Sequence, residues 1–185
     1  IPYILELGTE EQRQRWLPGM ADGSVIGAIA MTEPGTGSDL QGIRTTAVRD
    51  AGGDGWVLDG AKTFISSGIH ADVVVVVAKT DPAAGSRAFS LFLVERGDEG
   101  FERGRQLTKV GLEGQDTAEL VFKGVRLSAD RMLGQEGMGM RYLMERLARE
   151  RLSIAVAAVA ASEAAVKWAL DYVFEREAFG QRIGD

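Results

Sequence analysis

The stretch Val25-Ile26-Gly27-Ala28-Ile29-Ala30-Met31-Thr32-Glu33-Pro34-Gly35-Thr36-Gly37-Ser38-Asp39 changes character near its middle. Its first six residues are mostly apolar and predict a β-strand, and the rest is a loop of turn-forming residues. Because Gly35 and Gly37 lack a Cβ, their backbone N–H groups are open to close approach by a ligand. Such N–H groups suit an anion, for example a diphosphate. The spacing fits neither GxGxxG nor GxxxxGK[ST], so composition alone also allows an ordinary surface loop.

Short runs rich in β-branched or aromatic residues continue on both sides of a turn at residues 50–55 and a connection at 81–85. The run at 73–77 is five valines without alternation, which indicates a strand buried on both faces. Strands at this spacing, without long helices between them, predict an antiparallel barrel or sandwich. The predicted strands are residues 25–31, 45–50, 56–59, 63–66, 73–79, 89–95 and 120–122.

Helical patterns lie at the two ends of the chain. Residues 1–20 predict a helix, with a start signal at Thr9 and an end at Pro18 and Gly19. From residue 137 to 174, apolar side chains recur at three- and four-residue steps, which predicts a long amphipathic helix, with or without an interruption. The predicted fold class is therefore α+β, with a central antiparallel β-barrel or sandwich flanked by helical segments.

Composition excludes several classes of protein. The net charge is −6 and no block of lysine or arginine occurs, which argues against a nucleic-acid surface. The chain has no cysteine and a single histidine, His70, which neighbouring turn formers place in an ordinary loop. No dense apolar run approaches the ~20 residues of a membrane span, and no signal sequence opens the chain. We therefore expect a soluble, intracellular protein without a membrane span or a metal site.

Four motifs in the chain resemble those of the acyl-CoA dehydrogenase family. They are residues 27–42, 60–68, 114–122 and 176–180, in the family's order and at family-like separations. Residues 115–120 and 150–152 point to the long-chain branch. The resemblance implies a truncated acyl-CoA dehydrogenase-like fold: 1–24 as the tail of an N-terminal helical domain, 25–131 as a β domain that binds flavin and acyl-CoA, and 132–185 as the first part of a C-terminal helical bundle.

The family resemblance also implies a reaction. It is FAD-dependent α,β-dehydrogenation of an acyl-CoA thioester, of long or branched chain, in fatty acid β-oxidation. The alternatives are an acyl-CoA oxidase and a non-catalytic flavoprotein or interaction protein on the same scaffold. An electron-transfer flavoprotein is the implied electron acceptor, the implied assembly is a homo-oligomer (dimer or tetramer), and the 185-residue chain alone is expected to be inactive. The cytoplasm of a bacterium is the favoured location, with the mitochondrial matrix as the other.

Glu150 is the candidate catalytic residue. It lies three residues after Leu147 and four before Ile154, on the apolar stripe of the predicted helix. Partial desolvation there would raise its pKa and suit it to accept a proton. The same spacing allows an ordinary helix ion pair with Arg146 at i−4. In the long-chain and isovaleryl branches that the sequence resembles, the glutamate of this Glu-Arg-Leu motif is the catalytic base.

The remaining site residues follow from the resemblance alone. Phe64 stands where many relatives have tryptophan, and Ser66 where many have threonine; both keep an aromatic wall and a hydroxyl donor. Arg176 would reach the FAD of a neighbouring subunit, and Arg141 stands where the nearest branch has a tyrosine contact. The implied flavin-binding residues are Ile29, Ala30, Met31, Thr32, Glu33, Pro34, Gly35, Thr36, Gly37, Ser38, Phe64, Ile65, Ser66 and Arg176. The implied acyl-CoA-binding residues are Ser38, Ser86, Arg87, Arg141, Ala148, Arg149, Glu150 and Arg151.

Overall fold

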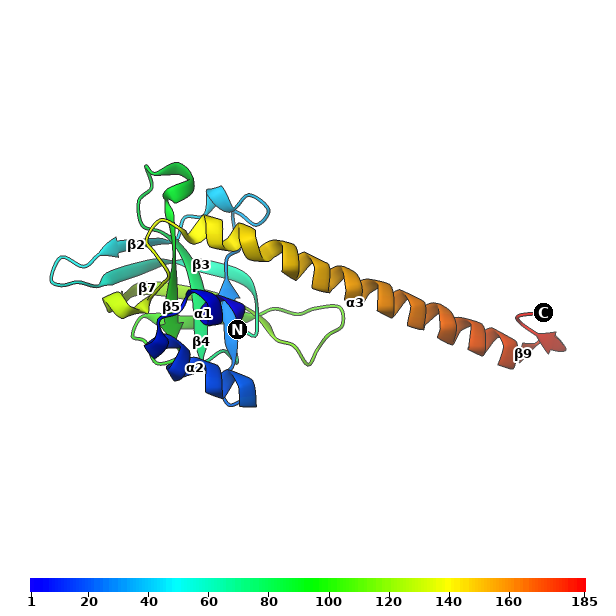
Figure 1. Cartoon of the computed structure of the whole chain (residues 1–185). Coiled ribbons are helices and arrows are strands. Elements are labelled where there is room, and N and C mark those ends of the chain that lie inside the picture. The colour runs from blue at the N-terminus through cyan, green and yellow to red at the C-terminus, as the bar shows by residue number, and fades with distance from the viewer. The chain divides into compact units, whose positions relative to one another are not determined.

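A computed structural model describes all 185 residues, which form two compact units, Ile1–Arg141 and Tyr142–Asp185. The domain boundaries expected from the sequence stay predictions. The first unit holds two helices and eight strands, drawn from blue to yellow-green in Figure 1. The strands are β1 (Gly27–Ala30), β2 (Thr46–Arg49), β3 (Trp56–Ser66), β4 (Val73–Lys79), β5 (Phe89–Glu95), β6 (Phe101–Gln106), β7 (Thr117–Leu127) and β8 (Met132–Leu133).

The N-terminal region forms two helices instead of the predicted single one. They are α1 (Pro2–Leu7) and α2 (Glu10–Asp22). Thr9 begins α2 through a capping box, as predicted, because its hydroxyl accepts from the N–H of Gln12 at 3.3 Å and its N–H donates to Gln12 Oε1 at 3.0 Å. The predicted end at Pro18 is wrong. A proline removes only one N–H donor, and the left-handed residue that ends the helix is Gly23, with φ 83°.

The strands form one open sheet in the order β6-β7-β3-β2-β4-β5-β8, and β1 pairs with β4. The sheet does not close into a barrel, so that part of the prediction is wrong, whereas the sandwich fits. The pairing is also not purely antiparallel. Strand β1 runs parallel to β4 over four residues, and β2 meets β4 in parallel at one pair. Parallel pairs need long connections, and both strands are separated from β4 by more than twenty residues.

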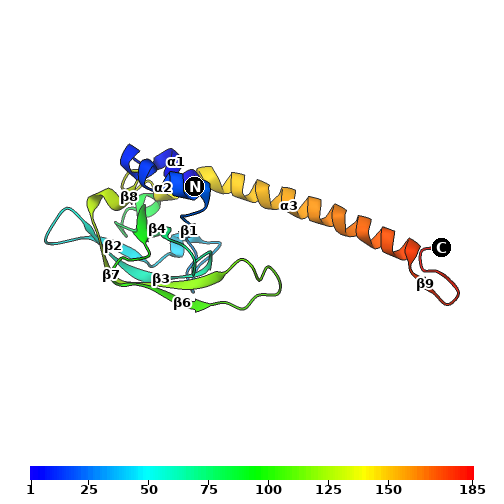
Figure 2. The same cartoon turned by 90° about the horizontal axis from the view of Figure 1, so that it is seen from below.

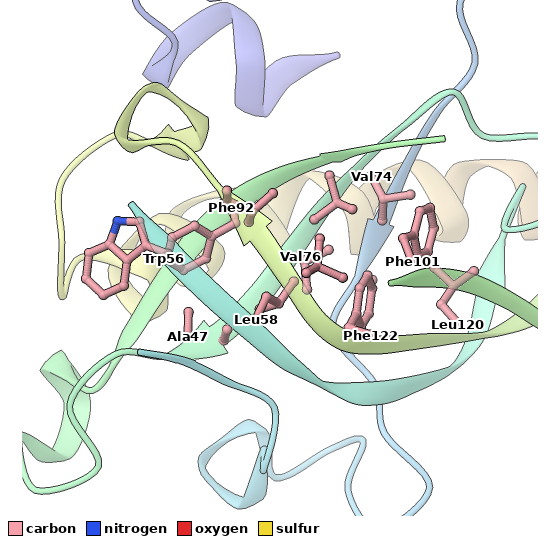
Figure 3. Packing of buried hydrophobic residues seen from close by; sticks show 14 of the residues in the cluster. Ala47, Trp56, Leu58, Val74, Val76, Phe92, Phe101, Leu120 and Phe122 are labelled. Carbon is pink, nitrogen blue, oxygen red and sulfur yellow. The ribbon is translucent and has the colours of Figure 1, made fainter. Parts of the chain in front are cut away.

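The core lies between the two ends of this sheet. Side chains from β3, β6 and β7 meet those from β4 and β5 in one buried cluster (Figure 3). Trp56 packs edge-on against Phe92, with ring centroids 5.4 Å apart, and Phe101 stacks on Phe122 at 5.2 Å. Strand β4 is buried from Val73 to Ala78, as its lack of alternation predicted. In Figure 2, α1 and α2 lie on the side of β4 away from β3, β6 and β7.

Buried Gln12 attaches α2 to the strand region of the first unit, residues 25–133, which is called the β unit below. Its Nε2 donates to the carbonyls of Asp130 at 2.6 Å and Met132 at 2.9 Å.

Two predicted strands, 56–59 and 63–66, are one long strand, β3, with irregular pairing to β7 on either side of its middle. The prediction missed β6, whose sequence is mostly polar because it is an edge strand with only Phe101 buried.

Helix α3 (Gly139–Glu175) is uninterrupted over 37 residues. A hairpin follows the helix and consists of β9 (Glu177–Ala178) and β10 (Gln181–Arg182). Its turn residues, Phe179 and Gly180, both have positive φ. An 18-residue window of α3 reaches a mean hydropathy of 1.4, so length and composition alone would allow it to cross a membrane. The core helix of a soluble protein passes the same test, and the finding does not decide between them.

Candidate functional site

The loop after β1, residues 31–39, has its own internal bonds. Glu33 and Thr36 exchange backbone hydrogen bonds of 2.8 and 3.1 Å, which closes a tight turn over Pro34 and Gly35. The Thr36 hydroxyl donates to the Asp39 carbonyl. The Asp39 carboxylate accepts from the N–H of Gln41 at 3.0 Å and so caps a short 3-10 helix, η1 (Leu40–Gly42). The loop is therefore a defined structure and not an extended linker.

Exposed residues of this loop offer unpaired backbone donors. The N–H groups of Gly35, Gly37 and Ser38 have no partner within the chain. A Cβ added to Gly35 would meet nothing within 4 Å, and one added to Gly37 would come no closer than 3.6 Å to Thr32 Cγ2. The protein's own packing therefore does not require glycine at either position. Open space beside unpaired N–H groups fits the predicted anion cradle.

Three hydrogen bonds join the loop to strand β3. The N–H of Thr63 donates to the Thr32 carbonyl at 2.9 Å. Lys62 Nζ donates to the Met31 carbonyl at 3.0 Å and to Glu33 Oε1 at 2.9 Å. Since these donors are consecutive residues of β3, the loop lies directly against the strand that carries Phe64.

The Glu33 carboxylate is buried and accepts four hydrogen bonds. Besides Lys62, its donors are the N–H of Arg44 at 2.6 Å and the N–H and hydroxyl of Thr45 at 2.9 and 2.5 Å. Burial alone would raise the pKa of Glu33, but the bonds from Thr45 and Arg44 and the charge of Lys62 outweigh burial and hold the pKa below its ordinary value. The Glu33 carboxylate thus bonds to groups of the protein itself. Its contribution to a ligand site would be to hold the loop in place.

Lys62 is buried completely, with 0% of its side chain exposed. Burial lowers the pKa of Lys62 from 10.5 to about 8, and the neighbouring Glu33 opposes that shift. Gly60 makes room for this cluster, because a Cβ there would lie 2.3 Å from the Thr45 hydroxyl oxygen. Sequence reasoning missed Lys62, since a single lysine within a β-strand run gives no local sign of a buried partner.

Phe64 is the most unusual residue near the loop. Its φ of 58° is left-handed, a region that a bulky residue seldom adopts, and its side chain is 67% exposed. It lies in the irregular part of β3, between Lys62 and buried Ile65. A strained, exposed aromatic residue next to a ligand loop favours a functional reason for the strain. Ser66 is exposed two residues later, and the aromatic wall and the hydroxyl donor stay predictions.

The third sequence motif has a structural role in this unit. Asp116 is buried, and its carboxylate accepts from the N–H of Ile69 at 2.7 Å, while its carbonyl accepts from the N–H of Ser67 at 3.0 Å. It therefore holds the turn that follows Ser66. His70 lies in that turn, exposed, as its neighbours in the sequence predicted.

The predicted acyl-CoA contacts lie on two elements, and their roles stay predictions. Ser86 and Arg87 are exposed on the 3-10 helix η2 (Gly85–Arg87), between β4 and β5. The others lie on α3, where Glu150 is partly buried and the rest are exposed: Arg141, Ala148, Arg149 and Arg151. Arg176 follows the end of α3, and its N–H donates to the Tyr172 carbonyl at 2.8 Å.

Two family models match the chain. Residues 28–125 match the acyl-CoA dehydrogenase middle domain, and residues 137–185 match the acyl-CoA dehydrogenase C-terminal domain. The chain belongs to the acyl-CoA dehydrogenase family. The middle-domain match contains the loop, Lys62, Phe64 and Asp116.

Individual relatives are similar over almost the whole chain. The mitochondrial long-chain specific acyl-CoA dehydrogenase of Sus scrofa is 53% identical over 185 residues, 99% of this chain and 43% of that protein. The crystal structure of an acyl-CoA dehydrogenase from Geobacillus kaustophilus is 54% identical, with a TM-score of 0.95 over 100% of this chain and 48% of that one. A glutaryl-CoA dehydrogenase from Mycobacterium smegmatis, solved in complex with FADH2, is 35% identical, with a TM-score of 0.88 over 98% and 45% of the two chains. The chain thus spans less than half the length of these relatives.

Proposed function

We propose that the chain is the flavin-binding part of an FAD-dependent acyl-CoA dehydrogenase that acts on long- or branched-chain thioesters. One observation carries the proposal: the unpaired N–H groups of Gly35, Gly37 and Ser38 lie in a loop bonded to the strand that presents exposed, strained Phe64. The N–H groups suit the diphosphate, and the phenyl ring suits one face of the flavin ring. The residues present therefore fit FAD.

In this proposal, bound FAD would accept a hydride from the β carbon of the acyl chain. The chain's own residues would do the rest. The Glu150 carboxylate would take the proton from the α carbon, and the Thr32 hydroxyl would lie at the ring edge. Ser38, Ser86, Arg87, Arg149 and Arg151 would contact the polar parts of acyl-CoA, where an arginine guanidinium matches a phosphate well.

The partners and location of the whole protein are part of the same proposal. An electron-transfer flavoprotein would accept the electrons, and Arg176 would reach the FAD of a neighbouring subunit in a homo-oligomer. Relatives occur both in mitochondria and in bacteria. The cytoplasm of a bacterium or the mitochondrial matrix would suit the reaction.

Anaerobic reduction of the full-length protein tests the function. The purified protein is expected to carry FAD, and palmitoyl-CoA or isovaleryl-CoA should bleach its absorbance more quickly than butyryl-CoA does. Peroxide formation in air at the rate of turnover would indicate an acyl-CoA oxidase instead. A colourless protein that neither takes up FAD nor binds acyl-CoA would indicate a non-catalytic protein on the same scaffold.

A further inference from the structure

A buried ion pair lies between strand β3 and the loop at residues 31–39, which is called the flavin loop below. Lys62 Nζ and Glu33 Oε1 are 2.9 Å apart, with 0% and 6% of the two side chains exposed. Removing two charges from water is costly, and apolar residues of similar size often serve stability as well or better. Stability alone therefore gives a weak reason for an ion pair at this position.

The pair connects the loop to β3 and to the residues just before β2, a strand that already pairs with β3. Lys62 belongs to β3 and Glu33 to the loop after β1. The other donors to Glu33 are Arg44 and Thr45, just before β2. The internal bonds of the loop, such as those between Glu33 and Thr36, shape the loop but do not orient it against β3. Lys62 supplies two of the three hydrogen bonds that do so.

We propose that Glu33 and Lys62 are positioning residues of the flavin site, whose ion pair fixes the N–H groups of Gly35, Gly37 and Ser38 relative to Phe64. The inference rests on the proposed function and names the residues that maintain the geometry of the site. A binding site needs its ligand-contacting groups held within about 0.5 Å by supporting residues. Thr45 belongs to the same set of residues, because its hydroxyl and its N–H both bond Glu33 Oε1.

The test compares flavin binding with stability in the full-length protein. The variants are Lys62→Met, Glu33→Gln, the double variant and the milder Thr45→Val, which keeps the side chain's shape but removes its hydroxyl. The matched control is Arg131→Met, which breaks a different shielded ion pair, with Glu95 at 3.2 Å and Asp98 at 3.2 Å, outside the flavin loop. Each apoprotein is titrated with FAD, and its melting temperature is measured with and without FAD.

We expect the single variants to raise the Kd for FAD about tenfold or more and to reduce the rise in melting temperature that FAD produces. The double variant should lose little more than either single variant, because the two residues act as a unit. Arg131→Met should lower the melting temperature but keep the full rise on FAD addition. If Lys62→Met does not fold, Thr45→Val decides the question by the same two measurements.

A purely structural pair gives a different pattern. In that case the melting temperature falls equally with and without FAD, and the Kd stays within about twofold of the unmodified protein. That pattern overturns the positioning role and leaves the proposed function intact. Failure of the unmodified protein to bind FAD overturns both proposals, so the two failures are distinguishable.

Discussion

The backbone N–H of Thr63 donates a hydrogen bond of 2.9 Å to the carbonyl of Thr32. This bond brings together the first two sequence motifs, which are far apart along the chain. It leaves the opposite side of the loop, with Gly35 and Gly37, open. The loop therefore has an inner side that the protein fixes and an outer side where substitutions report on a ligand.

Replacing Gly37 with valine should reduce flavin content without unfolding the β unit. The nearest atom to the added Cβ is Thr32 Cγ2 at 3.6 Å, which is ordinary contact, but the side chain would occupy the space of the diphosphate. We expect a change in unfolding free energy within about 0.5 kcal/mol and a clear fall in the ratio of flavin to protein absorbance. Gly53→Val is the control, since a Cβ there meets nothing within 4 Å and the position lies outside the loop. Normal flavin content in the Gly37 variant would show that the cradle is assigned to the wrong loop.

Replacing Glu150 with glutamine should abolish flavin reduction by substrate while FAD and acyl-CoA still bind. A glutamine cannot accept the α proton, and loss of a general base costs about 10²–10⁴ in rate. Glu163→Gln, an exposed position on the same helix, is the control and should reduce normally. If Glu150 serves only as an ion-pair partner of Arg146, the change would be about 0.2–0.5 kcal/mol in stability with near-normal bleaching.

The lowered pKa of Lys62 should make the unfolding free energy depend on pH in the alkaline range. Its pKa is about 8 in the folded protein and 10.5 when unperturbed, so between these values the unfolded chain holds a proton that the folded protein has released. The unfolding free energy should therefore rise with pH across this window, by up to roughly 3 kcal/mol relative to Lys62→Met. Urea denaturation of both proteins at a series of pH values measures the difference. A difference that stays flat or falls from pH 8 upward would contradict the buried, desolvated lysine.

Replacing Asp116 with alanine should destabilise the β unit by about 1–3 kcal/mol, because the N–H of Ile69 would lose its acceptor. Denaturant unfolding measures this loss. Asp54→Ala, in the exposed turn between β2 and β3, is the control and should change stability little. Equal stability of the two variants would show that another group accepts from Ile69.

The 185-residue chain expressed alone should self-associate and bind FAD weakly. Large apolar side chains of α3 are exposed, among them Ile154 at 69%, Trp168 at 70% and Tyr172 at 60%. An apolar surface of this extent favours association. Gel filtration with light scattering measures the mass, and a monomer that retains stoichiometric yellow flavin would contradict the prediction.

Local patterns predicted the local parts of the fold. The bounds of β4 and β5, the turn before β3 and the cap at Thr9 all follow from residues close together in sequence. The parallel pairing of β1 with β4 was not predictable in this way, since it depends on long-range contacts. The same reason applies to the site. The four motifs point to the loop that we propose to bind flavin. The bond between Glu33 and Lys62, however, joins residues with no local relation, and the left-handed φ of Phe64 has no glycine to signal it.

The strand pairing also has a consequence for the order of folding. Strands β4 and β5 pair in full antiparallel register across a short connection, whereas residues 67–116 separate β3 from β7. Closing the longer loop costs more chain entropy, so the β4–β5 hairpin should form early and the β3–β7 pair late. The flavin loop depends on Lys62 and Thr63 of β3, so it should be among the last segments to take its final shape. Nascent chains would then acquire the capacity to hold FAD only after the rest of the β unit has condensed.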